Sequence, residues 1–115
     1  MWSKNVFHDG VYEYDVLLYV ANWPAPRRNV WDILLKARAI ENQACVLGVN
    51  TVGRDGNNVE YSGGTIAINA KGETLKKAND NKEEVIVTTL SYEELSNFRE
   101  KFKVGMDWDR FTLSP

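Results

Sequence analysis

The sequence predicts an α/β fold with a mixed sheet, formed by one domain. Residues 15–21 and residues 45–49 are apolar runs with the composition of buried strands. Between them, apolar residues recur at the three- and four-residue spacing of a helix. The order strand, helix, strand is typical of a mixed α/β layer. The chain has 115 residues, 43% of them hydrophobic and 26% charged, which is enough apolar material for one core but not for two.

The first strand is expected to be covered on both faces, because its apolar run does not alternate with polar residues. It is expected to end at Asn22-Trp23-Pro24, since Pro24 has no N–H to donate and restricts the backbone of the preceding tryptophan. Residues 1–14 mix aromatic and polar side chains without a clean period. We interpret them as the remnant of a preceding helix, with a turn at Asp9-Gly10.

The central helix is predicted over residues 30–44, with Asn29 as its N-terminal cap. After the second strand, residues 54–58 form a loop of residue types that tolerate left-handed backbone. The helix residues at the spacing of a shared face are Trp31, Leu34, Leu35, Arg38 and Glu41.

The second half of the chain predicts a hairpin, a strand and a helix. Residues 61–70 and 73–78 flank Lys71-Gly72, which suits a tight turn. Residues 84–90 alternate in character and predict a strand. Ser91, followed by Glu94, is a capping box that opens a helix extending to Phe102. From residue 103 onward the tail has aromatic residues but no period.

Charge and composition exclude several classes of partner. A net charge of −2, with scattered Lys and Arg residues, leaves no basic surface for nucleic acid. The longest apolar run, residues 16–21, is far shorter than the roughly 20 residues of a membrane-spanning helix. One cysteine allows no intrachain disulfide and suits a reducing compartment. We therefore predict a cytoplasmic protein without nucleic-acid or membrane partners.

The residue types that usually carry catalysis are few. Cys45 is the single thiol and lies within an apolar strand, where a thiolate is costly, so a structural role is favoured. His8 is the single histidine, and a surface or packing role is favoured for it. The chain does not supply the usual sets of zinc ligands, so no metal site is predicted.

Three further patterns have both a structural and a functional interpretation. Gly63-Gly64-Thr65 lacks the lysine and the following helix of a phosphate loop, and close strand packing is favoured. Arg38 and Glu41, three residues apart on the helix, favour an ion pair that braces it over a contribution to a pocket. Asn22 and Trp23 lie where a strand ends, the usual place for binding groups in open α/β sheets. For them, pocket and packing interpretations are equally supported.

Three segments of the chain follow one another in a distinctive order and spacing. They are Asp15-Val16-Leu17-Leu18-Tyr19-Val20-Ala21-Asn22-Trp23-Pro24, Trp31-x-x-Leu34-Leu35-x-Ala37-Arg38-Ala39-Ile40-Glu41-Asn42-Gln43 and Tyr61-x-Gly63-x-Thr65-x-x-x-Asn69-x-x-Gly72-Glu73. Together they resemble the carbon–nitrogen hydrolases of the nitrilase superfamily. Within that superfamily, the Asn-Trp-Pro-Ala-Pro-Arg segment at residues 22–27 and the segment at residues 99–102 are most similar to bacterial omega-amidases. The resemblance extends from residue 1 to residue 113.

The resemblance implies an α-β-β-α sandwich that hydrolyses amides with a Glu-Lys-Cys triad. In such enzymes the cysteine attacks the carbon, the glutamate transfers its proton, and the lysine with a backbone N–H stabilises the oxyanion. The implied substrates are small 2-oxo acids with a terminal amide, from which ammonia is released. No metal or organic cofactor is implied.

The resemblance also implies that residues 1–115 are a single partial domain, the C-terminal half of such a sandwich. Residues 1–5 resemble those just after the family's catalytic cysteine, so all three triad residues are expected upstream, and no catalytic residue is assigned here. Cys45 matches a position that is not the nucleophile. Ala70 stands where a proline is common in the family. The implied substrate-binding residues are Asn22, Trp23 and Arg27, with Arg38 and Glu41 as structural support.

Two hypotheses about function follow from the resemblance. The first is an omega-amidase-like hydrolase whose C-terminal part, by itself, is inactive. The second is a noncatalytic structural partner that completes a split hydrolase or docks onto an intact homologue. In either case the strand at residues 16–20 is expected to expose an apolar edge, and association through that edge, or formation of a homo-oligomer, is expected.

Overall fold

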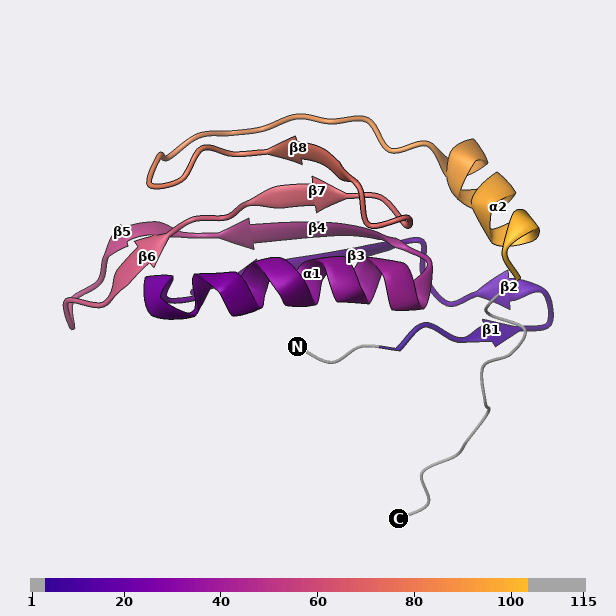
Figure 1. Ribbon diagram of the computed structural model, residues 1–115, viewed down its shortest axis with the longest axis horizontal. Coiled ribbons are helices and arrows are strands. Elements are labelled where there is room, and N and C mark those ends of the chain that lie inside the picture. The colour runs from indigo at the N-terminus through magenta and orange to yellow at the C-terminus, as the bar shows by residue number, and fades with distance from the viewer. Residues whose placement is uncertain (1–3, 104–115) are drawn as a thin grey trace, which may run out of the picture.

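A four-stranded mixed sheet covered by one long helix forms the centre of the molecule (Figure 1). The structure is a computed structural model, and residues 4–103 are described. The strand order is β3-β4-β7-β8, in which β3 and β4 are parallel and the other neighbours are antiparallel. This confirms the predicted mixed α/β layer. The strands and the helix are β3 (Val16–Ala21), α1 (Arg28–Asn42), β4 (Cys45–Asn50), β7 (Ile66–Ile68) and β8 (Thr74–Lys77).

The start of α1 differs from the prediction. Pro24 has an extended backbone, and a short 3-10 helix, η1 (Ala25–Arg27), leads straight into α1 at Arg28. Because the chain is already helical before residue 29, the predicted cap Asn29 is wrong, and no side chain caps α1. The helix ends at Gln43, whose left-handed backbone lets its N–H reach the carbonyl groups of the last turn.

The core lies between α1 and one face of the sheet. Trp31 and Leu35, two residues of the predicted helix face, are fully buried there, whereas Glu41 is exposed. At Gly48 in β4, an added Cβ would lie only 2.7 Å from Leu35 Cδ1, so the helix packs directly on the strand backbone. The core residues are Trp31, Leu35, Ala39, Val46, Ile66 and Ile68.

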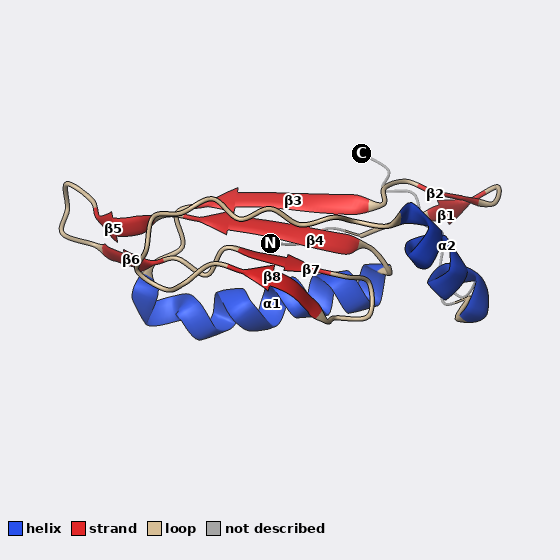
Figure 2. Cartoon of the chain, turned by 90° about the horizontal axis from the view of Figure 1, so that it is seen from above, coloured by secondary structure: helices blue, strands red, loops and turns tan. Residues whose placement is uncertain are grey.

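The other face of the sheet is open at β3 and β4. Leu18 and Val20 are 64% and 84% exposed, and Val16 and Val49 are exposed as well. The expectation that β3 is covered on both faces is therefore wrong for the described chain. Figure 2 shows α1 on one side of the sheet only, and the shortest dimension of the molecule is 17 Å, which corresponds to two layers.

The N-terminal segment forms a small hairpin, so its interpretation as the remnant of a helix is wrong. Strands β1 (Phe7–His8) and β2 (Val11–Tyr12) pair antiparallel. The predicted turn at Asp9-Gly10 is confirmed, and both residues have positive φ angles, 51° and 79°. Ahead of the hairpin, the buried Asn5 donates its N–H to Asn42 Oδ1 at 2.9 Å and fixes this segment to the end of α1.

The hairpin predicted around Lys71-Gly72 is confirmed as the β7–β8 pair. The strand predicted over residues 61–70 is divided in two, because Gly63 and Gly64 have φ angles near 90° that a strand does not accommodate. Its first part, β6 (Glu60–Ser62), pairs instead with β5 (Val52–Arg54) in a separate hairpin.

Residues 84–90 are extended but join no strand ladder, so the predicted strand is wrong. Their side chains alternate between half-buried and exposed, which accounts for the alternating sequence pattern. A strand also needs a neighbouring strand for its backbone hydrogen bonds, and the pattern does not reveal whether one is present. The following helix, α2 (Tyr92–Lys101), is confirmed. Its capping box is also confirmed, with the N–H of Glu94 donating to Ser91 Oγ at 3.1 Å.

The buried Arg99 fixes α2 to the rest of the fold. Its Nη1 lies 2.6 Å from Asp15 Oδ1, and its Nε donates to the Gln43 carbonyl at 2.8 Å. Its Nη2 donates to the Tyr14 carbonyl, and its guanidinium lies 3.7 Å from the centre of the Tyr12 ring. One side chain thus connects α2 to the ends of β2, β3 and α1.

Within residues 4–103 no helix is long and apolar enough to cross a membrane. The same residues contain no cluster of His, Cys, Asp and Glu side chains suited to a metal ion. The aromatic tail predicted beyond residue 103 falls outside the described residues, apart from Lys103 itself.

Candidate functional site

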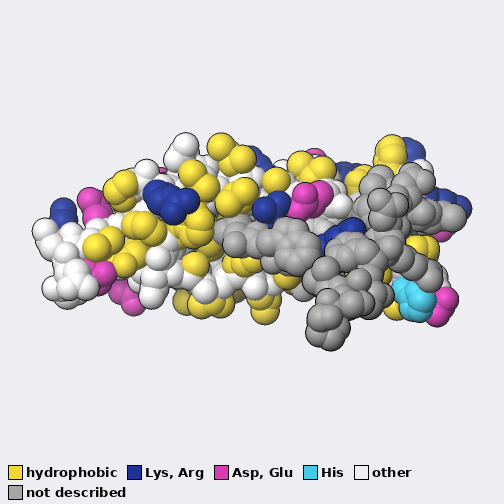
Figure 3. Space-filling model, turned by 90° about the horizontal axis from the view of Figure 1, so that it is seen from below, with side chains coloured by type: hydrophobic (Ala, Val, Ile, Leu, Met, Phe, Trp, Pro, Cys, Tyr) yellow, Lys and Arg dark blue, Asp and Glu magenta, His cyan; other side chains and the backbone are white. Residues whose placement is uncertain are grey.

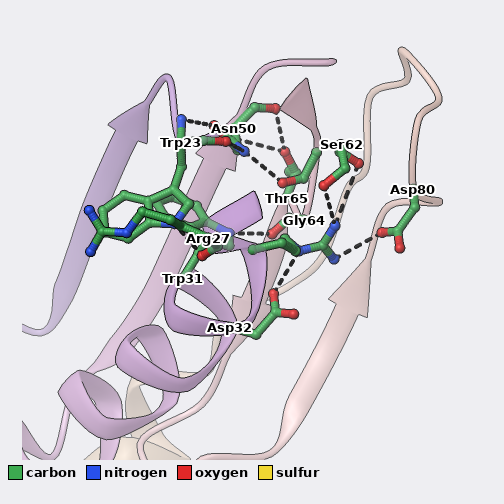
Figure 4. Close-up of polar contacts among 11 residues, drawn as sticks. Trp23, Arg27, Trp31, Asp32, Asn50, Ser62, Gly64, Thr65 and Asp80 are labelled. Carbon is green, nitrogen blue, oxygen red and sulfur yellow. Dashed lines mark hydrogen bonds and ion pairs between the residues drawn. The ribbon is translucent and has the colours of Figure 1, made fainter. Parts of the chain in front are cut away.

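The side chain of Asn50 fixes the loop that follows β3. Asn50 is the last residue of β4 and is buried. Its Oδ1 accepts the Trp23 N–H at 2.7 Å, and its Nδ2 donates to the carbonyl groups of Trp23 and Gly63 at 2.9 and 2.8 Å (Figure 4). The Asn50 N–H donates to Thr65 Oγ1. The carboxyl ends of the parallel strands β3 and β4 are thereby joined through one amide.

Trp23 lies between the core and an exposed cation. Its indole Nε1–H donates to the Arg27 carbonyl at 2.6 Å, which closes the turn before α1. Its ring is 5.8 Å from the Trp31 ring on one side, and the Arg27 guanidinium is 5.2 Å from its centre. Trp23 therefore has both a packing role and a position at the strand ends, and Arg27 places a positive charge beside it.

A second set of contacts holds the Gly63-Gly64 segment under the start of α1. The indole of Trp31 donates to the Gly64 carbonyl at 2.9 Å. A Cβ on Gly64 would lie 2.4 Å from Arg28 Nε, so this position requires glycine. Arg28 forms ion pairs with Asp32 and Asp80, both at 2.9 Å (Figure 4). The glycine pair is thus closely packed, but it lies between β6 and β7 rather than in a strand, and the closest neighbour of Gly64 is an arginine of α1.

The structure brings together three of the five predicted site residues. Asn22 and Arg27 are exposed on the loop that carries Trp23. Arg38 and Glu41 form the expected ion pair, at 2.7 Å, but near the far end of α1. At 1.5 Å per residue, Arg38 lies about 15 Å along the helix from Arg28. The ion pair between Arg38 and Glu41 braces the helix. The role of these two residues as structural support for a substrate site stays a prediction.

A cavity of about 440 Å³ lies at the opposite end of β4, between α2 and the β7–β8 hairpin. Asn22 and Trp23 are not among its lining residues, so it is separate from the strand-end loop. Cys45 is one of its lining residues, is only 5% exposed, and has a thiol pKa raised by burial. A thiol in this state is a poor nucleophile, in agreement with the predicted structural role.

Cys45 is expected to react slowly with iodoacetamide in the folded protein. Burial limits access, and the raised pKa lowers the thiolate fraction at every pH below it. Mass spectrometry at pH 8 should show much slower alkylation without urea than in 8 M urea, where the thiol regains its ordinary pKa. Equal rates in the two conditions would contradict the burial.

Asn50 is a site residue that was not predicted from the sequence. The rule that pointed to Asn22 and Trp23, namely a polar residue where an apolar strand ends, also applies to Asn50 at the end of the second strand. Arg28 gave no such signal, because its partner Asp80 is distant in sequence.

The model of the carbon-nitrogen hydrolase family matches residues 12–100 of this chain. The chain belongs to the carbon–nitrogen hydrolase family. Among its relatives is "Omega-amidase YafV" of Escherichia coli K12, 47% identical over 113 residues, which are 98% of this chain and 42% of that protein. A "2-oxoglutaramate amidase" of Bacillus subtilis is 38% identical over 94 residues, which are 81% of this chain and 35% of that protein.

Solved structures agree with the family assignment. The carbon–nitrogen hydrolase XC1258 from Xanthomonas campestris is similar to this chain with a TM-score of 0.92 and 38% identity. The match covers 96% of this chain and 43% of that one, and that structure is described as having an arsenic adduct in its active site. The predicted fold class is confirmed. This carbon–nitrogen hydrolase chain spans less than half the length of the relatives it matches.

Proposed function

We propose that this chain forms the C-terminal α-β layer of an omega-amidase-type hydrolase. The complete enzyme would hydrolyse the terminal amide of a small 2-oxo acid and release ammonia. The main support is the 47% identity to the E. coli omega-amidase across 98% of this chain. A cytoplasmic location is proposed with it, on the basis of the single cysteine.

In this proposal the reaction needs groups that these 115 residues do not provide. An amide carbon must be attacked by an activated nucleophile, with donors placed for the oxyanion. The one cysteine, Cys45, is buried and lies at the end of β4 opposite Trp23. We therefore propose that glutamate, lysine and cysteine of the family's triad come from polypeptide outside this chain, and that the chain alone is inactive.

The contribution proposed for this chain is one wall of the substrate pocket. Asn22 offers an exposed amide, Trp23 an aromatic surface, and Arg27 a positive charge beside it. The Asn50 amide holds the loop at both the N–H and the carbonyl of Trp23, so the wall is preorganised. A pocket for a small polar acid needs just such a combination of apolar surface and a few fixed polar groups.

Complementation with the E. coli omega-amidase tests the proposal. The part of that enzyme that precedes its match to this chain would be produced alone, co-expressed with this chain, and fused to it. Ammonia release from 2-oxoglutaramate is expected only when both parts are present. In the fusion, Trp23→Ala should lower the rate at least about tenfold, whereas the exposed control Lys36→Ala should leave it unchanged.

Two results would contradict the proposal. One is turnover of 2-oxoglutaramate by this chain alone that is lost in Cys45→Ala. The other is a fusion that folds, as judged by circular dichroism, but stays inactive.

The second candidate function is that of a noncatalytic structural partner. The open edge and open face of β3 favour it, because they offer a surface on which a homologous sheet can pack. In this case the chain should co-purify with an intact omega-amidase without changing its rate of ammonia release. Absence of co-purification would rule this candidate out.

A further inference from the structure

The Gly63-Gly64 pair between β6 and β7 is linked to Trp23 by two routes. The carbonyl of Gly63 accepts a hydrogen bond from Asn50 Nδ2 at 2.8 Å, and the carbonyl of Gly64 accepts one from the Trp31 indole at 2.9 Å. Asn50 also bonds the backbone of Trp23, and the ring of Trp31 lies 5.8 Å from the ring of Trp23. Two consecutive carbonyl groups thus bind the two side chains that fix Trp23 (Figure 4).

The Asn50 amide in the first route has a single satisfactory orientation. Its Oδ1 accepts the N–H of Trp23 and its Nδ2 donates to two carbonyl groups, so a flipped amide would lose all three bonds. The Asn50 backbone is fixed as well, because its N–H donates to Thr65 Oγ1 at 3.0 Å and its carbonyl accepts from the same hydroxyl at 3.3 Å. A buried polar group with every bond satisfied is rigid, so Asn50 transmits the position of Gly63 to Trp23.

Arg28 fixes the glycine pair to the start of α1. Its side chain is only 14% exposed and forms ion pairs with Asp32 and Asp80, both at 2.9 Å. Its Nη1 also donates to Ser62 Oγ at 3.3 Å, and its guanidinium leaves no room for a Cβ on Gly64. The planar fork of an arginine serves these partners at the same time, which the single ammonium of a lysine does not do.

We infer that Arg28 is a positioning residue for the pocket wall that carries Trp23. It fixes the Gly63-Gly64 pair, which through Asn50 and Trp31 fixes the backbone and the ring of Trp23. Because a misplacement of about 1 Å can lower an enzymatic rate about 100-fold, such a device is of use beside a substrate. The inference deepens the proposed function and rests on it, since it requires that Trp23 lie beside a substrate.

NMR spectra of the chain test the route without any activity. The signals are the backbone N–H and the indole N–H of Trp23, assigned with Trp23→Phe. Arg28→Met should shift both signals and raise the exchange rate of the backbone N–H at least about tenfold, because the bond to Asn50 Oδ1 is then less firmly held. Arg28→Lys should have a smaller effect of the same kind, because it keeps the charge but not the planar fork.

Combining Arg28→Met with Asn50→Ala tests whether Asn50 lies on the route. Asn50→Ala removes the acceptor of the Trp23 N–H and should by itself raise the exchange rate at least about tenfold. If Arg28 acts through Asn50, the double variant should exchange about as fast as Asn50→Ala, because that bond is already lost. Two effects that multiply would contradict this route.

Two arginine variants are the controls for charge and for stability. Arg54→Met removes an exposed arginine that pairs with Glu60 on the β5–β6 hairpin. Arg99→Met removes buried contacts to Asp15 and Gln43, at the opposite ends of β3 and α1 from Trp23. Neither should move the Trp23 signals. A general effect of charge is not expected, because Lys and Arg side chains are dispersed over the face shown in Figure 3 instead of forming one patch.

The fusion with the N-terminal part of the E. coli omega-amidase tests the consequence for a substrate. Arg28→Met should lower kcat/KM for 2-oxoglutaramate at least about tenfold, whereas Arg54→Met should leave it unchanged. An active fusion that Arg28→Met does not slow would overturn this inference alone. A fusion that is inactive without any substitution contradicts the proposed function, and the Trp23 signals of the chain then decide whether Arg28 positions Trp23.

Unmoved Trp23 signals in Arg28→Met, in a chain that circular dichroism shows to be folded, would overturn the inference. If Arg28→Met does not fold, the milder Arg28→Lys decides by the same two signals. Equal shifts in Arg28→Met and Arg99→Met would also overturn it, because the effect would then be one of general destabilisation.

Discussion

Replacement of Trp31 by alanine is expected to lower the free energy of unfolding by about 3–5 kcal/mol. The side chain is fully buried at the centre of the core, so its removal leaves a large cavity between α1 and the sheet. It also takes away the indole bond to the Gly64 carbonyl and the ring contact with Trp23. Because small domains have a total stability of about 5–15 kcal/mol, this one change removes a large share of it.

Urea denaturation followed by circular dichroism measures the effect without relying on tryptophan fluorescence. Ile33→Ala is the matched control, since Ile33 lies on the same helix but is mostly exposed. Its free energy of unfolding should fall by only about 0.5 kcal/mol. Trp31→Phe keeps a ring and loses the indole bond, so it should fall between the two. A loss below about 1 kcal/mol for Trp31→Ala would contradict the role given to this residue.

Arg99→Met is expected to lower the free energy of unfolding by about 2–3 kcal/mol and to loosen α2. The substitution keeps a long apolar side chain but leaves the Gln43 and Tyr14 carbonyl groups without their donor. It also removes the cation that pairs with Asp15, although that carboxylate is half exposed and regains water. The effect on α2 should exceed the effect on the core, because the core contains no Arg99 contact.

Hydrogen exchange read by mass spectrometry separates these two effects. Amides of α2 should exchange much faster in Arg99→Met than in the unmodified chain, while those of β4 change little. Lys101→Met is the control, because it removes a positive charge from the same helix at an exposed position. If the two variants gave equal exchange in α2, the buried contacts of Arg99 would not be what holds that helix.

The elements that sequence patterns predicted well are those fixed by local chemistry. The apolar runs of β3 and β4, the helix between them, the turn at Lys71-Gly72 and the capping box at Ser91 each carry their signal within a few residues. The predictions were wrong where the structure depends on which distant segment lies beside the residues in question. Residues 84–90 have the alternation of a strand but no ladder partner, and β3 has the composition of a doubly covered strand with one face open.

The candidate site also contains residues that the local sequence predicts and residues whose role depends on distant contacts. Asn22 and Trp23 were predicted because the end of an apolar strand is visible in the sequence. The role of Asn50 depends on which loop passes over it, and Trp23 is 27 residues away along the chain. The partners of Arg99 are still more distant, with Asp15 separated from it by 84 residues. Long-range contacts of this kind leave no periodic trace in one sequence.

The strand order β3-β4-β7-β8 is the same in space as along the chain, and this has a consequence for folding. Each strand can add to the edge left by the strand before it, and none has to enter between two strands that are already paired. Loop closures stay short, which favours fast folding, and during synthesis each new strand finds its neighbour already made. Within residues 4–103 the sheet can therefore grow in one direction, from the parallel β3–β4 pair out to β8.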